Sequence, residues 1–142
     1  MPDVRHPELQ RIEVVSAEVE REVFRFVRAS SGDDPRLLDD FRSDAERGKT
    51  PRGRSGTVPG LMDGMSAFRS LELARDRWRA IAALALRQGR PVAVGESIAN
   101  VTLVAGRGFA YEDLGEPGGH MTIWGTPESL LAAVAGIVPA AV

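Results

Sequence analysis

A chain of 142 residues with a formal net charge of −2 predicts one domain that buries a core and has no general attraction to nucleic acid or anionic lipid. The absence of cysteine excludes disulfides, thiol catalysis and cysteine-ligated zinc, and it is typical of a cytoplasmic protein. No apolar run approaches the roughly 18 residues of a spanning helix, and residues 1–10 lack an apolar core, so we expect neither a membrane segment nor a signal peptide.

The first strong secondary-structure signal is an alternating strand. Residues 1–20 carry mixed signals, so we expect loose order there, with either a short helix or a lead-in strand within 8–20. Residues 22–28 alternate with a period of two and are rich in β-branched and aromatic side chains, which predicts a strand. Arg25 shares one face of this strand with two valines. Its side chain either reaches solvent beside them or points into a cleft, where a guanidinium can bind phosphate or carboxylate.

A helix and a polar loop are expected next. Asp34 is a suitable N-cap and Pro35 a suitable first helical residue, while Gly48 is a suitable stop. The buried stripe of this helix is expected to be Leu37, Leu38 and Phe41. Residues 48–60 combine glycine, proline and cationic side chains. They predict a long polar loop, which is more often a solvated connection than a functional segment.

The longest predicted element is a helix in the middle of the chain. A short strand or turn at residues 64–68 precedes it, Ser70 caps it, and it continues to Gln88. Trp78 is interpreted as a core anchor of this helix rather than as a platform for a ligand. The apolar stripe recurs at steps of three and four residues and comprises Leu71, Ala74, Trp78, Ile81, Ala82, Ala85 and Leu86.

The last third of the chain mixes short strands with one helix. Strands are expected at residues 92–94 and 97–105, with the alternation slipping near Asn100, and an acidic connection follows at 111–116. The remaining elements are a strand at 120–124, a helix from Pro127 to Val134 capped by Thr126 and ended by Gly136, and a terminal strand at 137–142 with Pro139 at a sheet edge.

Together these elements predict a single α+β domain over residues 1–142. Strands and helices are interspersed without regular alternation, and glycine-rich links join the later strands. That order favours a mixed or mostly antiparallel sheet packed with one long central helix and two shorter helices. A doubly wound parallel sheet would require more regular crossovers.

Candidate chemistry centres on His120, which follows two glycines at the start of a predicted strand. This imidazole is either a general acid or base with room for a ligand, or a neutral residue bonded to the backbone. Among the nearby carboxylates Glu112, Asp113 and Glu116, the last stands four residues from His120. It either orients the imidazole or stabilises an oxocarbenium-like ribose, unless the acidic segment is solvated surface. No metal site is expected, because no helix pairs a histidine with carboxylates at ligand spacing.

Ser66 is the second polar candidate, because it lies between a predicted strand and the long helix. It would approach Arg25 if their two strands are neighbours. Its context, Gly64-x-Ser66-x-Phe68, is not G-x-S-x-G, which argues against a hydrolase nucleophile. The chain also lacks G-x-G-x-x-G and G-x-x-x-x-G-K-[ST], so the standard nucleotide-binding loops are absent.

Five segments in consistent order resemble a group of small uncharacterised bacterial proteins with a domain of unknown function. This resemblance implies no particular activity. The segments are Phe24-Arg25-x-Val27-Arg28, Asp40-Phe41-x-Ser43, Gly64-x-Ser66-x-Phe68, Ile98-Ala99-x-Val101-Thr102-Leu103 and His120-x-Thr122-Ile123-Trp124-Gly125.

A second resemblance is to the ADP-ribosyltransferase-like architecture. It rests on an arginine on an early strand, a serine on a later strand that leads into a helix, and a polar or acidic residue on a late strand. The resemblance implies that Arg25 and Ser66 bind NAD and that Glu116 or His120 is catalytic.

The leading functional hypothesis is a cytoplasmic protein whose cleft, lined by Arg25, Ser66 and His120, binds a nucleotide-like or phosphate-bearing ligand. An NAD-consuming, toxin-like activity is one form of it. The alternative is a non-catalytic interaction module, such as an immunity, antitoxin or partner-binding domain, that uses the loops at 48–60 and 111–116. Nucleic-acid binding is disfavoured, because the cationic residues of the first loop have no basic face or aromatic platform around them.

Overall fold

One antiparallel sheet dominates the computed structural model, which describes residues 12–14, 20–43, 46–48 and 64–141. Its order is β1-β5-β6-β3-β2-β4-β7, and every pairing between neighbours is antiparallel. The predicted α+β class with a mostly antiparallel sheet is therefore confirmed. The strands are β1 (Ile12–Val14), β2 (Arg21–Val27), β3 (Met65–Phe68), β4 (Ser97–Leu103), β5 (Ala110–Glu112), β6 (His120–Trp124) and β7 (Val134–Pro139).

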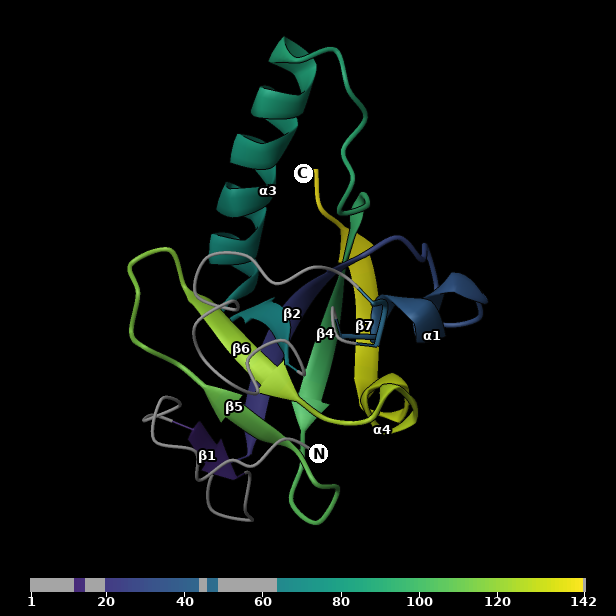
Figure 1. Ribbon diagram of the computed structural model, residues 1–142, viewed down its shortest axis with the longest axis vertical. Coiled ribbons are helices and arrows are strands. Elements are labelled where there is room, and N and C mark those ends of the chain that lie inside the picture. Colours follow the sequence, from purple (N-terminus) through teal and green to yellow (C-terminus); the bar gives the residue numbers. More distant parts are fainter. Residues whose placement is uncertain (1–11, 15–19, 44–45, 49–63, 142) are drawn as a thin grey trace.

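The described helices cover opposite faces of this sheet. The long helix α3 (Leu71–Arg87) packs on one face and then continues past the end of the sheet, as Figure 1 shows. The two short helices α1 (Arg36–Asp40) and α4 (Pro127–Ala132) contact each other beside β7 (Figure 1). One long and two shorter helices agree with the sequence prediction. Among the described residues, no helix combines the length and apolar character needed to cross a membrane.

The alternation of each strand divides the core into two clusters. The larger cluster lies under α1 and α4, while the smaller one lies under α3, where Trp78 and Leu71 pack against it. The Trp78 indole N–H also donates to the carbonyl of Gly95 at 2.8 Å, as suits a core anchor with a polar edge. The smaller cluster comprises Phe24, Phe68, Ala74, Ile98 and Ala140.

Several local signals place the elements as expected. Ser70 and Thr126 cap α3 and α4, each accepting a backbone N–H at 3.1 Å. The slip near Asn100 is a register shift in the pairing of β4 with β7. Pro139 lies on β7, which ends the sheet, and an edge strand tolerates its missing N–H.

The first helix is shorter than expected. It begins at Arg36 rather than Pro35, and the Asp34 carboxylate accepts the backbone N–H of Arg36 at 3.0 Å. The helix ends at Asp40, well before Gly48, which belongs to a separate turn. Of the three residues expected on its buried stripe, Leu37 and Phe41 are buried, while Leu38 is 40% exposed.

Three further expectations, about residues 92–94, Gly136 and Leu86, are wrong. Residues 92–94 form a turn rather than a strand, because they lie between α3 and β4 without a strand partner. Gly136 does not end a helix; it lies within β7 opposite Asn100. Leu86 does not belong to a buried stripe, because it is 82% exposed in the last turn of α3.

The remaining expectations concern the N-terminal third. Within residues 8–20, the lead-in strand is present as β1, which pairs with β5. The rest of the segment expected to be loosely ordered lies outside the described residues, apart from residue 20. The expected loop at 48–60 also lies outside them, apart from Gly48.

Candidate functional site

Antiparallel pairing of β3 with β6 brings Ser66 and His120 together. Ser66 is opposite Thr122 and Phe68 is opposite His120, so the serine and the histidine are diagonal neighbours on one face. The distance between Ser66 Oγ and His120 Nε2 is 3.1 Å. A hydroxyl and an imidazole at this distance can share a proton.

Glu116 approaches the other nitrogen of the same imidazole. Its Oε2 lies 4.0 Å from His120 Nδ1, and both side chains are about half-exposed. The backbone N–H of Gly119 donates to the Glu116 carbonyl at 2.9 Å, which closes the turn that returns the carboxylate toward His120. Only glycine fits this turn: Gly119 has φ of 77°, and a Cβ there would lie 2.5 Å from the Leu73 side chain.

The Arg25 side chain connects its own strand, β2, to the neighbouring strand β3. Its Nε donates to the carbonyl of Asp40 at 2.9 Å, and its Nη1 donates to the carbonyl of Ser66 at 2.7 Å. Along the described lengths of β2 and β3, one pair of residues is matched between the two strands, Phe24 with Phe68. The guanidinium therefore binds a strand carbonyl at the point where the two strands diverge.

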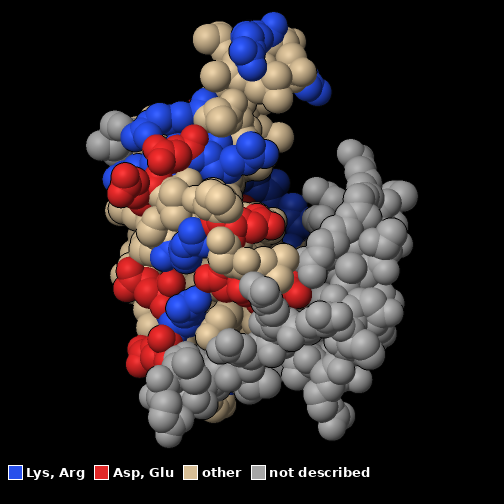
Figure 2. Space-filling model, turned by 90° about the vertical axis from the view of Figure 1, so that its left-hand side faces the viewer, with Lys and Arg blue, Asp and Glu red and all other residues tan. Residues whose placement is uncertain are grey.

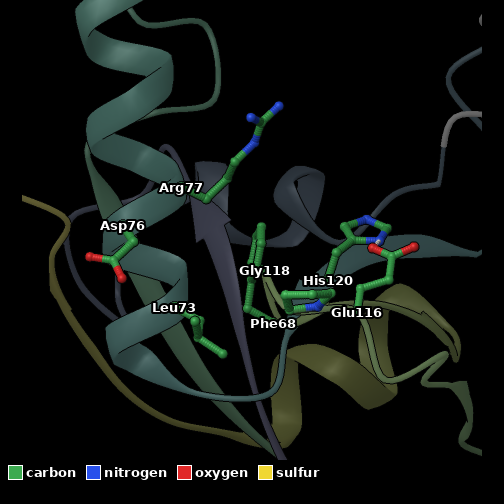
Figure 3. Close-up of a pocket in the computed structure, with 8 residues that line it drawn as sticks. Phe68, Leu73, Asp76, Arg77, Glu116, Gly118 and His120 are labelled. Atoms are coloured by element: carbon green, nitrogen blue, oxygen red, sulfur yellow. Dashed lines mark ion pairs between the residues drawn. The ribbon is translucent and has the colours of Figure 1, made fainter.

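The four residues selected from sequence thus form one continuous series, but they line two adjoining hollows rather than one cleft. Arg25 and Ser66 line a smaller hollow of about 230 Å³. His120 and Glu116 line a larger one of about 660 Å³, in which they lie together across from Leu73 on α3 (Figure 3). The bond between Ser66 and His120 joins the two hollows.

Aromatic rings also run from one hollow to the other. Phe26 lines the smaller hollow, and its ring centroid lies 5.1 Å from that of Phe68, which lines the larger one. The Phe68 ring in turn meets the His120 imidazole edge-on at 5.8 Å. Apolar walls therefore accompany the polar series over its whole length.

The smaller hollow is positively charged. Four arginines line it, Arg25, Arg28, Arg42 and Arg47, against one lining aspartate, Asp40. Asp40 is 4% exposed, and its carboxylate accepts the backbone N–H groups of Arg28 and Ala29 at 3.1 and 3.0 Å and Nε of Arg28 at 3.1 Å. The side-chain bond from Arg28 to Asp40, followed by the one to Asp39, raises the pKa of Arg28 above its ordinary value. We call the smaller hollow, which Arg25, Arg28, Arg42 and Arg47 line, the arginine hollow.

Asp39 stands at the rim of the arginine hollow and gives stability a pH dependence. Hydrogen bonds from Arg28 first, and Arg42 second, lower the pKa of Asp39 below its ordinary value of about 3.9. Its contribution is therefore complete above that value and is lost as the pH falls through the lower folded-state pKa. Because Asp39 is 43% exposed, we expect this contribution to be below about 1 kcal/mol.

The test compares Asp39→Asn with the unchanged chain by urea denaturation at pH 7 and pH 3. The unchanged chain should lose more of its free energy of unfolding between these two values than Asp39→Asn does. Equal losses would contradict the role given to Asp39. The exposed variant Asp33→Asn serves as the control for removing one carboxylate from this region.

The acidic stretch at 111–116 is not one solvated loop. Tyr111 and Glu112 belong to β5, which pairs on both sides, and Glu112 is only 2% exposed. Asp113 pairs with Arg21 at 3.0 Å and lies 3.7 Å from Arg69. Of the three carboxylates considered for His120, Glu116 lies 4.0 Å from its imidazole, Glu112 lies opposite Thr122 of β6, and Asp113 pairs with Arg21.

Sequence reasoning missed several lining residues. Arg42 and Arg47 line the arginine hollow from the segment after α1, while Asp76 and Arg77 of α3 are lining residues of the larger hollow, although the Asp76 carboxylate points away from His120 (Figure 3). The α3 pair occupies polar positions of an amphipathic helix, which normally face solvent. The only available signal for Arg42 and Arg47 was the number of arginines near the end of the expected helix.

Charge outside the hollows is mixed. Figure 2 shows acidic and basic side chains interspersed on the face that it presents, without a broad area of one sign. Among the described residues, no group of three or more His, Asp or Glu side chains is placed to hold a metal ion. No family model matches the chain, and no curated protein or solved structure matches it either.

Proposed function

We propose that this cytoplasmic protein binds a nucleotide-like, phosphate-bearing ligand across the two hollows, with NAD as the leading candidate. The observation that carries the proposal is the continuous series Arg25–Ser66–His120–Glu116, which joins a cationic hollow to a larger, partly apolar one. A dinucleotide also has one strongly anionic part and several flat or apolar parts.

The arginine hollow supports a site for phosphate. Guanidinium groups bind phosphate oxygens through paired, charge-assisted hydrogen bonds. The larger hollow supports a site for a ribose and its base, because Phe68 and Leu73 offer apolar walls while His120 and Glu116 offer polar groups. Small-molecule sites commonly combine mostly apolar walls with a few polar groups.

An NAD-consuming reaction, as in ADP-ribosyl transfer, would use the polar end of the larger hollow. Breaking the bond between ribose and nicotinamide creates positive charge on the sugar, which a nearby carboxylate stabilises. Glu116, which lies 4.0 Å from His120 Nδ1, would take this role. His120 would accept the proton of the attacking hydroxyl as a general base.

Thermal shift and nicotinamide release test this proposal. A ligand at one hundred times its Kd should stabilise the fold by about 2.7 kcal/mol. Arg42→Ala should weaken NAD and ADP binding about 10- to 150-fold, the loss of one charge-assisted bond of about 1.5–3 kcal/mol. Arg87→Ala, at the exposed end of α3, is the matched control and should leave binding unchanged.

His120→Ala separates binding from chemistry. Because its side chain is 43% exposed, its removal should leave the melting temperature nearly unchanged while slowing nicotinamide release by about 10²- to 10⁴-fold. The proposal fails if neither NAD nor ADP shifts the melting temperature at millimolar concentration, or if Arg42→Ala and Arg87→Ala bind equally well.

A second candidate is a non-catalytic interaction module of the immunity, antitoxin or partner-binding kind. The observation that favours it is the apolar end of α3: Leu84 is 47% exposed and lines a hollow of about 350 Å³ with Pro91, and Leu86 nearby on the helix is 82% exposed. This surface differs from the expected loops: 49–60 lies outside the described residues, and 111–116 is partly buried strand. A purified complex that Leu86→Glu dissociates, together with no response to nucleotides, would favour this candidate.

A further inference from the structure

The structure assigns Ser66, His120 and Glu116 to a nucleophilic relay, and we propose that it hydrolyses carboxylic esters with a short apolar acyl group. This activity would use the same hollow as the proposed NAD site, but it does not rest on NAD binding. Ser66 Oγ is the nucleophile, His120 Nε2 at 3.1 Å is the base, and Glu116 at 4.0 Å from Nδ1 orients the imidazole. A nucleophile, a base within hydrogen-bond reach and a third group behind the base form the arrangement by which serine is activated.

The missing G-x-S-x-G motif does not exclude this arrangement. In that motif a sharp turn exposes the serine, whereas here Ser66 is exposed on a short strand beside the point where β2 and β3 diverge. The pairing of β3 with β6 then supplies the histidine from 54 residues along the chain. Serine activation is recognised by geometry and not by sequence position.

Positive charge lies next to the nucleophile. Arg25 Nη1 donates to the carbonyl of Ser66 itself at 2.7 Å, so its guanidinium is fixed beside the residue that would carry the acyl group. Attack on an ester carbonyl places negative charge on the carbonyl oxygen. A guanidinium bound to the backbone of the nucleophile adds fixed positive charge to the surroundings of that oxygen.

The surroundings of the imidazole indicate the substrate class. Phe68, Leu73 and Pro117 line the hollow in which His120 lies. A short apolar acyl group fits against these walls, with its carbonyl carbon at Ser66 Oγ. An ester is the matching substrate because an alcohol leaves more readily than an amine, and His120 returns to it the proton taken from Ser66.

The reaction balances within these three residues and water. Ser66 Oγ forms a bond to the acyl carbon as its proton moves to His120 Nε2. The carbon–oxygen bond to the alcohol breaks, and that proton passes to the alcohol. Water then attacks the acyl-serine with the same base, which releases the acid and restores Ser66.

A fluorophosphonate probe and p-nitrophenyl butyrate test this assignment on the full chain. We expect one covalent adduct per chain, mapped to Ser66 by peptide mass spectrometry, and an initial burst of p-nitrophenol. Ser66→Ala should abolish both, while Ser30→Ala, another exposed serine, should change neither. His120→Gln should slow labelling of Ser66 by about 10²-fold or more.

Glu116 acts through His120, so its test is kinetic. Glu116→Gln should lower kcat for the ester several-fold while leaving KM unchanged, whereas a merely structural loss would lower the fraction of folded chain. Circular dichroism on each variant measures that fraction. An unlabelled Ser66 in folded chain, or equal labelling in His120→Gln, overturns the assignment; a chain that binds NAD without taking the label overturns this proposal alone.

Discussion

Asp40→Asn is expected to lower the free energy of unfolding by about 3–5 kcal/mol, the usual effect of breaking a buried charge pair by removing one partner. The carboxylate is almost fully buried and accepts three hydrogen bonds at the end of β2, two of them from backbone N–H groups. An asparagine can accept with one atom only, and its NH₂ group would face donors.

Urea denaturation at pH 7 measures this loss, with Asp33→Asn as the control for an exposed aspartate in the loop before α1. That control should change stability by no more than about 0.5 kcal/mol. A similar small change in Asp40→Asn would show that Asp40 does not hold α1 against β2. The same variant also removes the carboxylate partner of Arg28, whereas the bond from Arg25 is to the backbone carbonyl of residue 40 and remains.

Trp124→Ala is expected to cost a similar amount, about 3–5 kcal/mol, because truncating a fully buried tryptophan leaves a large cavity. The Trp124 side chain is 0% exposed. Its ring also leaves no room at Gly64, where an added Cβ would lie 2.8 Å from an indole carbon. The surrounding sheet therefore has little freedom to close over the space.

Trp78→Ala is the matched comparison, because it removes the same side chain from a half-buried position on α3. Its loss should be clearly smaller than that of Trp124→Ala, and Trp124→Phe should lie between wild type and Trp124→Ala. Chemical denaturation followed by far-ultraviolet circular dichroism measures all three. Equal losses in the two alanine variants would contradict the assignment of Trp124 to the centre of the fold.

The sequence predicted the elements whose signals are local. The alternation around Arg25 and the capping residues Ser70 and Thr126 each lie within a few positions of the structure that they determine. The strands that the sequence failed to predict, or placed at the wrong residues, depend on partner strands that are far away in the sequence. Tyr111 is in a strand because β6 and β1 lie on either side of it, and Gly136 is in a strand because β4 accepts it.

The site was predicted in part for the same reason. Residue chemistry selected Arg25, Ser66 and His120. In the structure, Ser66 and His120 are neighbours on one face of the sheet, and Arg25 bonds to the Ser66 carbonyl across the gap between β2 and β3. Their division between two hollows depends on the register of β3 with its neighbours, and no local pattern contains that register. Arg47 was missed because its position depends on how the chain returns from α1.

The divergence of β2 and β3 has a mechanical consequence. It divides the sheet into a half containing β1, β5, β6 and β3 and a half containing β2, β4 and β7. The seam between β2 and β3 has one registered pair, and it is also held by the bond from Arg25 to the Ser66 carbonyl and by the contact of the Phe26 and Phe68 rings. A force that separates the two halves therefore acts on the residue proposed to hold the phosphate, so an anion that engages this side chain also changes the resistance of the seam to opening.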